Sequence, residues 1–147
     1  MFGESACCVR ATFELGGQMN LDFAKLDGLI PAIVQDARTG EVLMLGFMNE
    51  EAYEATRASG AVTFYSRTRG KLWRKGEQSG HTLHVREVRV DCDADTILVR
   101  ADPAGPGVCH EGYRSCFFRR LDEDGSEMVV EERAFDPNAV YGGESRR

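Results

Sequence analysis

Residues 29–48 read LIPAIVQDARTGEVLMLGFM and contain the local signals that decide the fold. The two ends of this stretch, residues 29–36 and 41–48, are rich in apolar side chains, and the turn signal DARTG lies between them. Apolar segments on either side of a short polar turn are typical of adjacent antiparallel strands. We therefore predict that the two segments form a β-hairpin.

The residues that follow, 49–60, predict the clearest helix of the chain. Asn49 is a favourable N-cap, because its side-chain oxygen accepts a hydrogen bond from an otherwise unpaired N–H of the first turn. Glu50 and Glu51 place negative charge at the positive end of the helix dipole. Gly60 then supplies the residue that most often ends a helix.

The remaining chain reads mainly as strands and loops. Three segments predict further strands: residues 61–67, 82–92 and 96–102. In the second of these, Val85 is out of step with the alternation of the later apolar residues. The polar, glycine-containing stretch 68–80 predicts a loop. Residues 109–121 read as a loop that enters a strand.

These elements predict a mostly β fold of the α+β class with one clear helix. A chain of 147 residues is long enough for one compact domain with a real core. We expect residues 19–121 to form this domain, preceded by a disordered leader at residues 1–18. Residues 122–147 are expected to add one short strand and a flexible acidic tail.

Composition narrows the possible functions. Eighteen Lys and Arg residues against 24 Asp and Glu residues give a net charge of −6, which argues against general binding to nucleic acid or to anionic membranes. No apolar run is long enough for a membrane span, and the N-terminus lacks a secretion signal. We therefore expect a cytoplasmic protein. In that reducing compartment its five cysteines are expected to be thiols, metal ligands or catalytic groups.

Three of these cysteines form a candidate zinc site. Cys109 and Cys116 bracket the short polar loop CHEGYRSC, and Cys92 lies upstream at the end of a strand. Three thiolates leave the fourth position of a tetrahedral zinc ion open for water, and His110 and Glu111 are the nearest candidate proton acceptors. The alternative is a buried Cys92 with two ordinary thiols or an oxidisable pair. Spacing alone favours neither interpretation.

A cluster of carboxylates surrounds Cys92. In a straight strand Asp91 and Asp95 would lie about 13 Å apart, so the chain must turn if Asp91, Asp93 and Asp95 are to share an ion. Oxygen ligands of this kind suit magnesium. A calcium loop of the EF-hand type fits poorly, because Thr96 occupies the position of its glycine. A solvated acidic turn is the simplest alternative.

The third candidate feature is the basic stretch at residues 66–80, SRTRGKLWRKGEQSG. Arg and Lys side chains bind phosphate, an aromatic face stacks on a base, and glycine permits close backbone approach. This combination suits a nucleotide, although a solvated basic loop with Trp73 packed on the core is the alternative. The candidate substrate contacts are Arg67, Trp73, Arg74, Lys75, Glu77, Ser79 and Gly80.

Taken together, these motifs resemble the phosphoribosyl-AMP cyclohydrolase family of histidine biosynthesis. The similarity runs from about Gly28 to Leu121, in the order LMLGFMNEEA, YSRTRGKLWRKGEQSG, DCDADT and CHEGYRSCF. Four motifs in the family's order are far more specific than any one of them. One minor departure is Leu83, where many members have glutamine.

The resemblance implies an intertwined homodimer with active sites at the subunit interface. In such a dimer Cys92 of one subunit completes a zinc site with Cys109 and Cys116 of the other, while the three aspartates bind magnesium. The reaction implied is hydrolytic opening of the adenine ring of phosphoribosyl-AMP, with His110 as the catalytic proton acceptor and donor. The pyrophosphohydrolase activity that precedes this step would come from another chain.

Two other functions compete with this expectation. A zinc nucleobase deaminase also activates water against a ring carbon, but the later PCxxC motif of that class does not follow CHEGYRSC. A small zinc-stabilised module that binds nucleotide phosphates would have a closed site with four protein ligands. Ammonia release would favour the first, and tight zinc binding without any reaction would favour the second.

Overall fold

The computed structural model describes residues 20–142, so the expected leader at residues 1–18 lies outside the described residues. The elements in chain order are a 3₁₀ helix η1 (Phe23–Leu26), β1 (Ile30–Asp36), β2 (Val42–Met48), α1 (Glu50–Ser59), β3 (Thr63–Ser66), β4 (Lys71–Arg74), β5 (Leu83–Val90), β6 (Ile97–Pro103), β7 (Arg119–Leu121), β8 (Glu127–Val129) and α2 (Pro137–Tyr141). The expected mostly β domain with one clear helix is confirmed.

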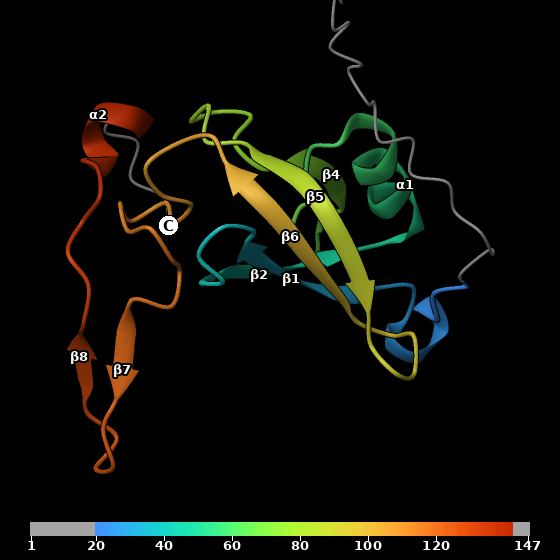
Figure 1. Cartoon of the computed structure of the whole chain (residues 1–147), viewed down its shortest axis with the longest axis horizontal. Helices are drawn as coiled ribbons and strands as arrows, with labels where there is room; N and C mark the ends of the chain where they lie inside the picture. Colours follow the sequence, from blue (N-terminus) through green and yellow to red (C-terminus); the bar gives the residue numbers. More distant parts are fainter. Residues whose placement is uncertain (1–19, 143–147) are drawn as a thin grey trace, which may run out of the picture.

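A four-stranded sheet with the order β2-β1-β6-β5 forms the centre of the molecule (Figure 1). The β1 strand pairs antiparallel with β2 and parallel with β6, and β6 pairs antiparallel with β5. Alternate residues of β1 are buried, and helix α1 contributes Ala52 to the same core. Gly46 of β2 leaves room for the Phe64 ring of β3, since a Cβ at Gly46 would lie 2.5 Å from that ring.

The predicted hairpin and helix are confirmed. Ile30 of β1 lies opposite Met48 of β2 in an antiparallel register. The side chain of Asn49 accepts a hydrogen bond from the N–H of Ala52 at 2.8 Å, as expected for an N-cap. Gly60 ends the helix in the left-handed conformation, with φ of 70°.

The prediction of a loop throughout residues 68–80 is wrong at residues 71–74, which form β4. This strand pairs antiparallel with β3 and places Trp73 opposite Phe64, with ring centroids 5.2 Å apart. Leu72 also packs against the core. The strand has only four residues, and its two ends are basic, so the charges conceal the short apolar segment between them.

The irregular position of Val85 in the predicted alternation has a structural cause. The pairing register of β5 with β6 shifts between Val85 and Glu87, as in a β-bulge. One extra residue on the bulged strand changes which face the following side chains occupy. The sequence pattern therefore located an irregularity, although not its effect on pairing.

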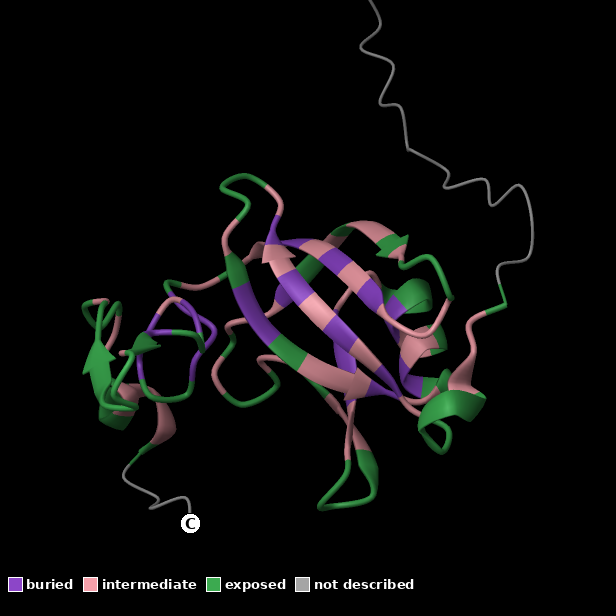
Figure 2. Ribbon diagram, turned by 90° about the horizontal axis from the view of Figure 1, so that it is seen from below, coloured by how far each residue is buried: buried purple, intermediate pink, exposed green. Residues whose placement is uncertain are grey.

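The C-terminal part extends away from this sheet. A loop of residues 104–118 leads to a hairpin of β7 and β8 that stands apart from the main body, followed by the short helix α2 (Figure 1). All residues of both hairpin strands are exposed, in contrast to the buried residues along the central sheet (Figure 2). Among residues 20–142, no helix has the length and apolar character required to cross a membrane.

Candidate functional site

A tight turn presents His110. The N–H of Gly112 donates to the carbonyl of Cys109 at 3.0 Å, so His110 and Glu111 occupy the exposed tip between them. At the base of the turn, the N–H of Cys109 donates to the carbonyl of Tyr113 at 3.1 Å. We call residues Cys109 to Gly112 the His110 turn.

The second cysteine of this loop is fixed to the central sheet. The N–H of Cys116 donates to the carbonyl of Leu43 in β2 at 2.8 Å. The neighbouring Ser115 hydroxyl is buried and donates to the carbonyl of Val42 at 2.8 Å. These two hydrogen bonds to carbonyls of β2 place Cys116 at a defined point beside that strand.

The thiols of Cys109 and Cys116 contact one another. A hydrogen bond from Cys116 lowers the pKa of Cys109 to about 6; burial opposes the shift, whereas the N–H of Glu111 and the charge of His110 support it. The same hydrogen bond, together with the negative charge of Cys109, raises the pKa of Cys116 above its ordinary value. The pair therefore carries one thiolate near neutral pH, centred on the buried Cys109.

An ion pair connects the loop to β1. Arg114 contacts the fully buried carboxylate of Asp36 and also that of Glu41. Burial alone would raise the pKa of Asp36, but the N–H groups of Arg38 and Thr39 and the guanidinium of Arg114 lower it overall. The loop that carries the two cysteines is thus anchored through a buried charge at the end of the first strand.

The three aspartates converge at a turn between β5 and β6. Asp91 accepts hydrogen bonds from the N–H of Asp95 at 3.0 Å and of Thr96 at 3.1 Å, and Ala94 has a φ of 62°. As a result, one carboxylate oxygen from each aspartate lies within 4.8 Å of the others. The chain turns here, as a shared ion site requires.

Sequence reasoning missed a fourth residue at this turn. The Lys25 ammonium donates to the Asp93 carboxylate at 3.1 Å and to that of Asp95 at 3.3 Å. Hydrogen bonds from Lys25 lower the pKa of Asp93, whereas burial and the neighbouring Asp91 raise that of Asp95. Lys25 lies 68 residues before Asp93, and no local pattern connects the two.

Within one chain, Cys92 does not join the other two cysteines. Among residues 20–142, the aspartates are the only group of three potential ligands that lie within reach of one ion. Cys92 lies in the turn before β6, whereas Cys109 and Cys116 follow the opposite end of that strand (Figure 1). The seven residues of β6 alone span about 20 Å.

Two residues of the basic stretch are already engaged in packing. Trp73 packs against Phe64 in the core, as the packing alternative requires, and the Arg67 guanidinium lies 4.0 Å from the centre of the Phe47 ring. The ammonium of Lys75 lies 5.7 Å from the Trp73 ring, and its charge partly opposes the rise in the pKa of Cys116. Lys75 is therefore the residue of the basic stretch whose charge acts on the cysteine pair.

The other predicted substrate contacts lie toward the C-terminal end of the basic stretch. Arg74 and Glu77 are exposed, at the end of β4 and in the following turn. The Ser79 hydroxyl accepts the N–H of His81 at 3.1 Å, and the N–H of Gly80 donates to the carbonyl of Gly76 at 2.7 Å. Ser79 and Gly80 thus form the turn that leads into β5.

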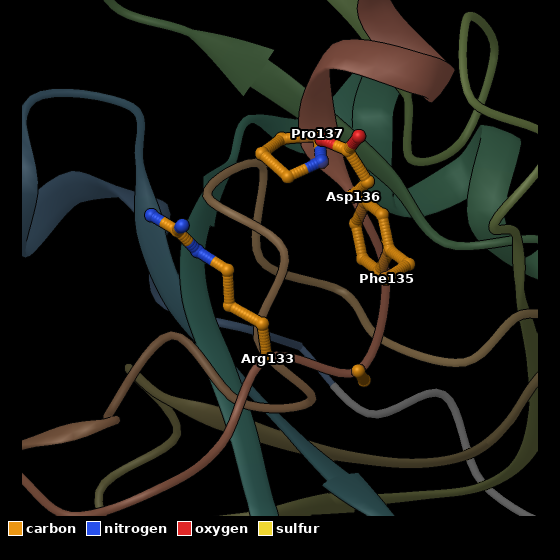
Figure 3. A pocket seen from close by; sticks show the side chains of 5 residues that line it. Arg133, Phe135, Asp136 and Pro137 are labelled. Carbon is orange, nitrogen blue, oxygen red and sulfur yellow. The ribbon is translucent and has the colours of Figure 1, made fainter.

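Residues 133–137 lie beside the loop of residues 109–116, which we call the cysteine loop. Sequence reasoning did not identify this segment. Its residues line an open depression of about 410 Å³, in which Arg133 faces Phe135 and Pro137 across the hollow (Figure 3). The Arg133 guanidinium donates to the carbonyl of Glu111 at 3.1 Å, next to His110. This segment follows an exposed hairpin, and its position beside the loop arises only from the tertiary fold.

Comparison with known proteins agrees with the motifs. The model of the phosphoribosyl-AMP cyclohydrolase family matches residues 44–118. A relative from Solibacter usitatus named phosphoribosyl-AMP cyclohydrolase is 58% identical over 127 residues, which cover 86% of this chain and 100% of the relative. Relatives of the same name from Nitratidesulfovibrio vulgaris and Haloquadratum walsbyi are 54% and 56% identical, over 82% and 78% of this chain and 94% and 83% of their own lengths. The chain therefore belongs to the phosphoribosyl-AMP cyclohydrolase family.

Proposed function

We propose that this protein opens the adenine ring of 1-(5-phosphoribosyl)-AMP by hydrolysing the bond between N1 and C6. The product is the formimino-aminoimidazole carboxamide ribotide intermediate, and the reaction is the third step of histidine biosynthesis. The observation that carries the proposal is the His110 turn, which presents a histidine beside a thiolate in a chain of this family. We also propose a cytoplasmic location, because its reducing conditions would keep the cysteine pair as free thiols.

Zinc is the metal that suits the cysteine pair. One acidified thiol in contact with a second thiol is a soft donor set, and soft donors favour zinc over magnesium or calcium. Cys109 and Cys116 would hold the ion, with Cys92 of a second copy as the third protein ligand. Zinc bound there supplies Lewis acidity, which makes water a better nucleophile near neutral pH.

Two observations support a homodimer with a shared site. Cys92 lies beyond the opposite end of β6 from the cysteine pair, so a three-cysteine site requires a second chain. The C-terminal hairpin and its flanks also expose apolar side chains, among them Leu121 at 69% and Phe117 at 57%. A two-stranded hairpin is only marginally stable alone in water, and a second copy of the chain would cover this apolar surface.

Magnesium is proposed for the aspartate turn. The carboxylates of Asp91, Asp93 and Asp95 are close enough to share one ion, and the ammonium of Lys25 shows that the turn attracts positive charge. Oxygen ligands at a hard cation suit magnesium, which commonly binds substrate phosphates as well. In the dimer this turn would lie near the cysteine pair of the other subunit and orient one phosphate.

Lys75 is the basic residue best placed to bind the substrate near the cysteines. The exposed Arg74 and Glu77 and the glycine turn at Gly80 would extend this contact along the same stretch. Arg67 and Trp73 would support the stretch from the core side, where their packing contacts already hold them. The substrate's second phosphate would bind along this surface.

His110 would transfer the proton whose position decides between ring opening and deamination. It accepts a proton from the water that adds to C6 and donates one to N1, so the bond between C6 and N1 breaks. The exocyclic amino group stays on C6 and becomes the amide nitrogen of the carboxamide. Protonation of N1 rather than of that amino group distinguishes ring opening from deamination.

An ultraviolet assay of the zinc-loaded protein with phosphoribosyl-AMP tests the proposal. Ring opening without release of ammonia is the expected result. Ammonia release from adenine or cytosine nucleosides would favour the deaminase alternative. Tight zinc binding by four protein ligands, with no change in the substrate, would favour a binding module.

A further inference from the structure

The C-terminal segment Arg133–Phe135 contacts the His110 turn through three hydrogen bonds. The N–H groups of Ala134 and Phe135 both donate to the carbonyl of Gly112, at 2.7 and 3.2 Å. The third is the bond from Arg133 to the Glu111 carbonyl at 3.1 Å. Three donors from one segment therefore converge on the two residues that follow His110.

The close approach depends on a glycine. Gly112 has a φ of 94°, and a Cβ at this position would lie 2.5 Å from the carbonyl oxygen of Phe135. A side chain at Gly112 would thus force the two segments apart and strain the turn. The absence of a side chain at Gly112 therefore allows the segment to pack directly against the turn.

The ring of Phe135 makes a second contact, on the other side of the segment. It packs edge-on against the ring of His81, with centroids 4.7 Å apart and planes at 83°. The His81 ring in turn lies against Gly105, where a Cβ would come within 2.4 Å of the ring. Gly105 belongs to the loop that leads to Cys109, and His81 directly follows the Ser79–Gly80 turn.

His81 contributes to this contact through its ring. Its Nδ1 atom is buried and has no hydrogen-bond partner among residues 20–142. Aromatic rings in edge-on contact are attracted through the complementary charge of ring edge and ring face. Phe135 therefore connects the end of the basic stretch to the His110 turn by packing on one side and by backbone hydrogen bonds on the other.

We propose that Phe135 is a positioning residue for ring opening, acting through the His110 turn. This inference rests on the proposed function, and it concerns a segment that lies beyond the residues matched by the family model, which end at residue 118. Phe135 holds the His110 turn at a fixed position relative to the basic stretch. His110 is thereby kept within reach of the adenine ring of the bound substrate. Small displacements of a catalytic group reduce turnover steeply.

Kinetics of Phe135→Ala and Phe135→Tyr test the proposal. Phe135→Ala is expected to lower kcat by about ten- to a hundredfold with little change in KM and with zinc retained, while Phe135→Tyr keeps the ring and most of the turnover. A raised KM with unchanged kcat would show direct substrate binding and overturn the proposal. Unchanged kcat with a lower melting temperature, or loss of zinc, would overturn it as well.

A matched control removes a ring elsewhere. Tyr53 pairs with Phe23 at a centroid distance of 6.5 Å, away from the cysteine loop. Tyr53→Ala is expected to lower thermal stability and leave kcat unchanged. An equal loss of kcat in this control would show that lost packing in general, rather than the position of the His110 turn, reduces turnover.

Variants of His81 approach the same contact from the other side. His81→Ala is expected to lower kcat as Phe135→Ala does, and the double variant to lose no more than either alone, because the two residues act as one contact. His81→Phe keeps a ring and should retain turnover. Additive losses, or a loss in His81→Phe equal to that in His81→Ala, would overturn the ring contact as the mechanism.

Hydrogen exchange supplies a readout that does not depend on turnover. In Phe135→Ala the amides of Cys109 and Gly112, whose hydrogen bonds close the His110 turn, are expected to exchange faster than in the wild-type protein. Unchanged exchange would overturn this inference even if the wild-type protein failed to open the ring. Faster exchange in a protein without activity would reject the proposed function and retain the contact.

Discussion

Arg114, which lies between Cys109 and Cys116 in the loop that follows β6, forms an ion pair with Asp36, whose carboxylate is fully buried at the end of β1. The N–H of Arg38 donates to the same carboxylate at 2.8 Å. A buried carboxylate requires such partners, because burial without them would raise its pKa and neutralise it. The pair therefore links the stability of the sheet to the position of the loop.

Asp36→Asn is expected to lower the free energy of unfolding by about 1–3 kcal/mol at neutral pH, since Arg114 loses a buried charged acceptor. The folded protein holds the pKa of Asp36 below its ordinary value of 3.8. Its contribution is therefore complete above that pH and is lost as the pH falls below it. Urea unfolding of both proteins should show a difference that shrinks from about pH 5 downward.

The control for this substitution is Glu54→Gln, which removes an exposed ion pair with Arg57 on α1. Exposed pairs of this spacing contribute little, so a change below about 0.5 kcal/mol is expected. An Asp36→Asn protein as stable as the wild type at neutral pH would contradict the role given to the buried pair.

His110→Ala is expected to reduce kcat for ring opening by about 100-fold or more, because general acid–base catalysis commonly contributes that much. Zinc content should stay normal, since His110 is not among the proposed ligands. His84 is an exposed histidine on β5, and His84→Ala provides the matched control with unchanged turnover. Normal activity in His110→Ala would remove this histidine from the mechanism.

The cysteine pair should be visible in the ultraviolet spectrum of metal-free protein. Because the hydrogen bond from Cys116 lowers the pKa of Cys109 to about 6, thiolate absorbance should rise with its midpoint near that pH. Cys116→Ala removes the donor, and the transition should move toward the ordinary thiol value of 9.0. A transition that does not move in Cys116→Ala would show that the two thiols are independent.

Lys25 is expected to compete with magnesium at the aspartate turn. Its ammonium occupies the carboxylates of Asp93 and Asp95, so Lys25→Met should bind magnesium several-fold more tightly by titration calorimetry. Lys71 is an exposed lysine on β4, and Lys71→Met makes the same charge change away from the turn. Equal magnesium affinities in the two variants would show that the net charge of the protein, and not the position of Lys25, controls magnesium binding.

Local signals were sufficient to predict the first hairpin and α1 from the sequence. Asn49 and Gly60 are capping residues whose effect needs no tertiary contact, and β1 and β2 are joined by a short turn. The strand β4 was missed because its two basic ends conceal the half-buried Leu72 and Trp73, and the packing of Trp73 against the Phe64 ring is a tertiary contact. The parallel pairing of β1 with β6 is a long-range contact, and residue periodicity carries no information about it.

The candidate site was predictable to a similar degree. The cysteine pair and His110 lie within residues 109–116 and the aspartates within residues 91–95, so each group could be proposed from one short stretch of sequence. The contacts of Lys25 and Arg114 join residues that are 68 and 78 positions from their partners, so spacing gives no sign of them. The separation of Cys92 from Cys109 depends on the length and direction of β6, which only the folded chain defines.

Mixing two inactive variants tests the shared zinc site most directly. Cys92→Ser and Cys109→Ser should each lose zinc and turnover as homodimers. In a mixed dimer, one site retains all three cysteines, with Cys92 from one chain and the pair from the other. Random pairing of equal amounts, by refolding or co-expression, should therefore restore about one quarter of wild-type zinc and activity. A mixture that remains without zinc and without activity would contradict a site completed by two chains.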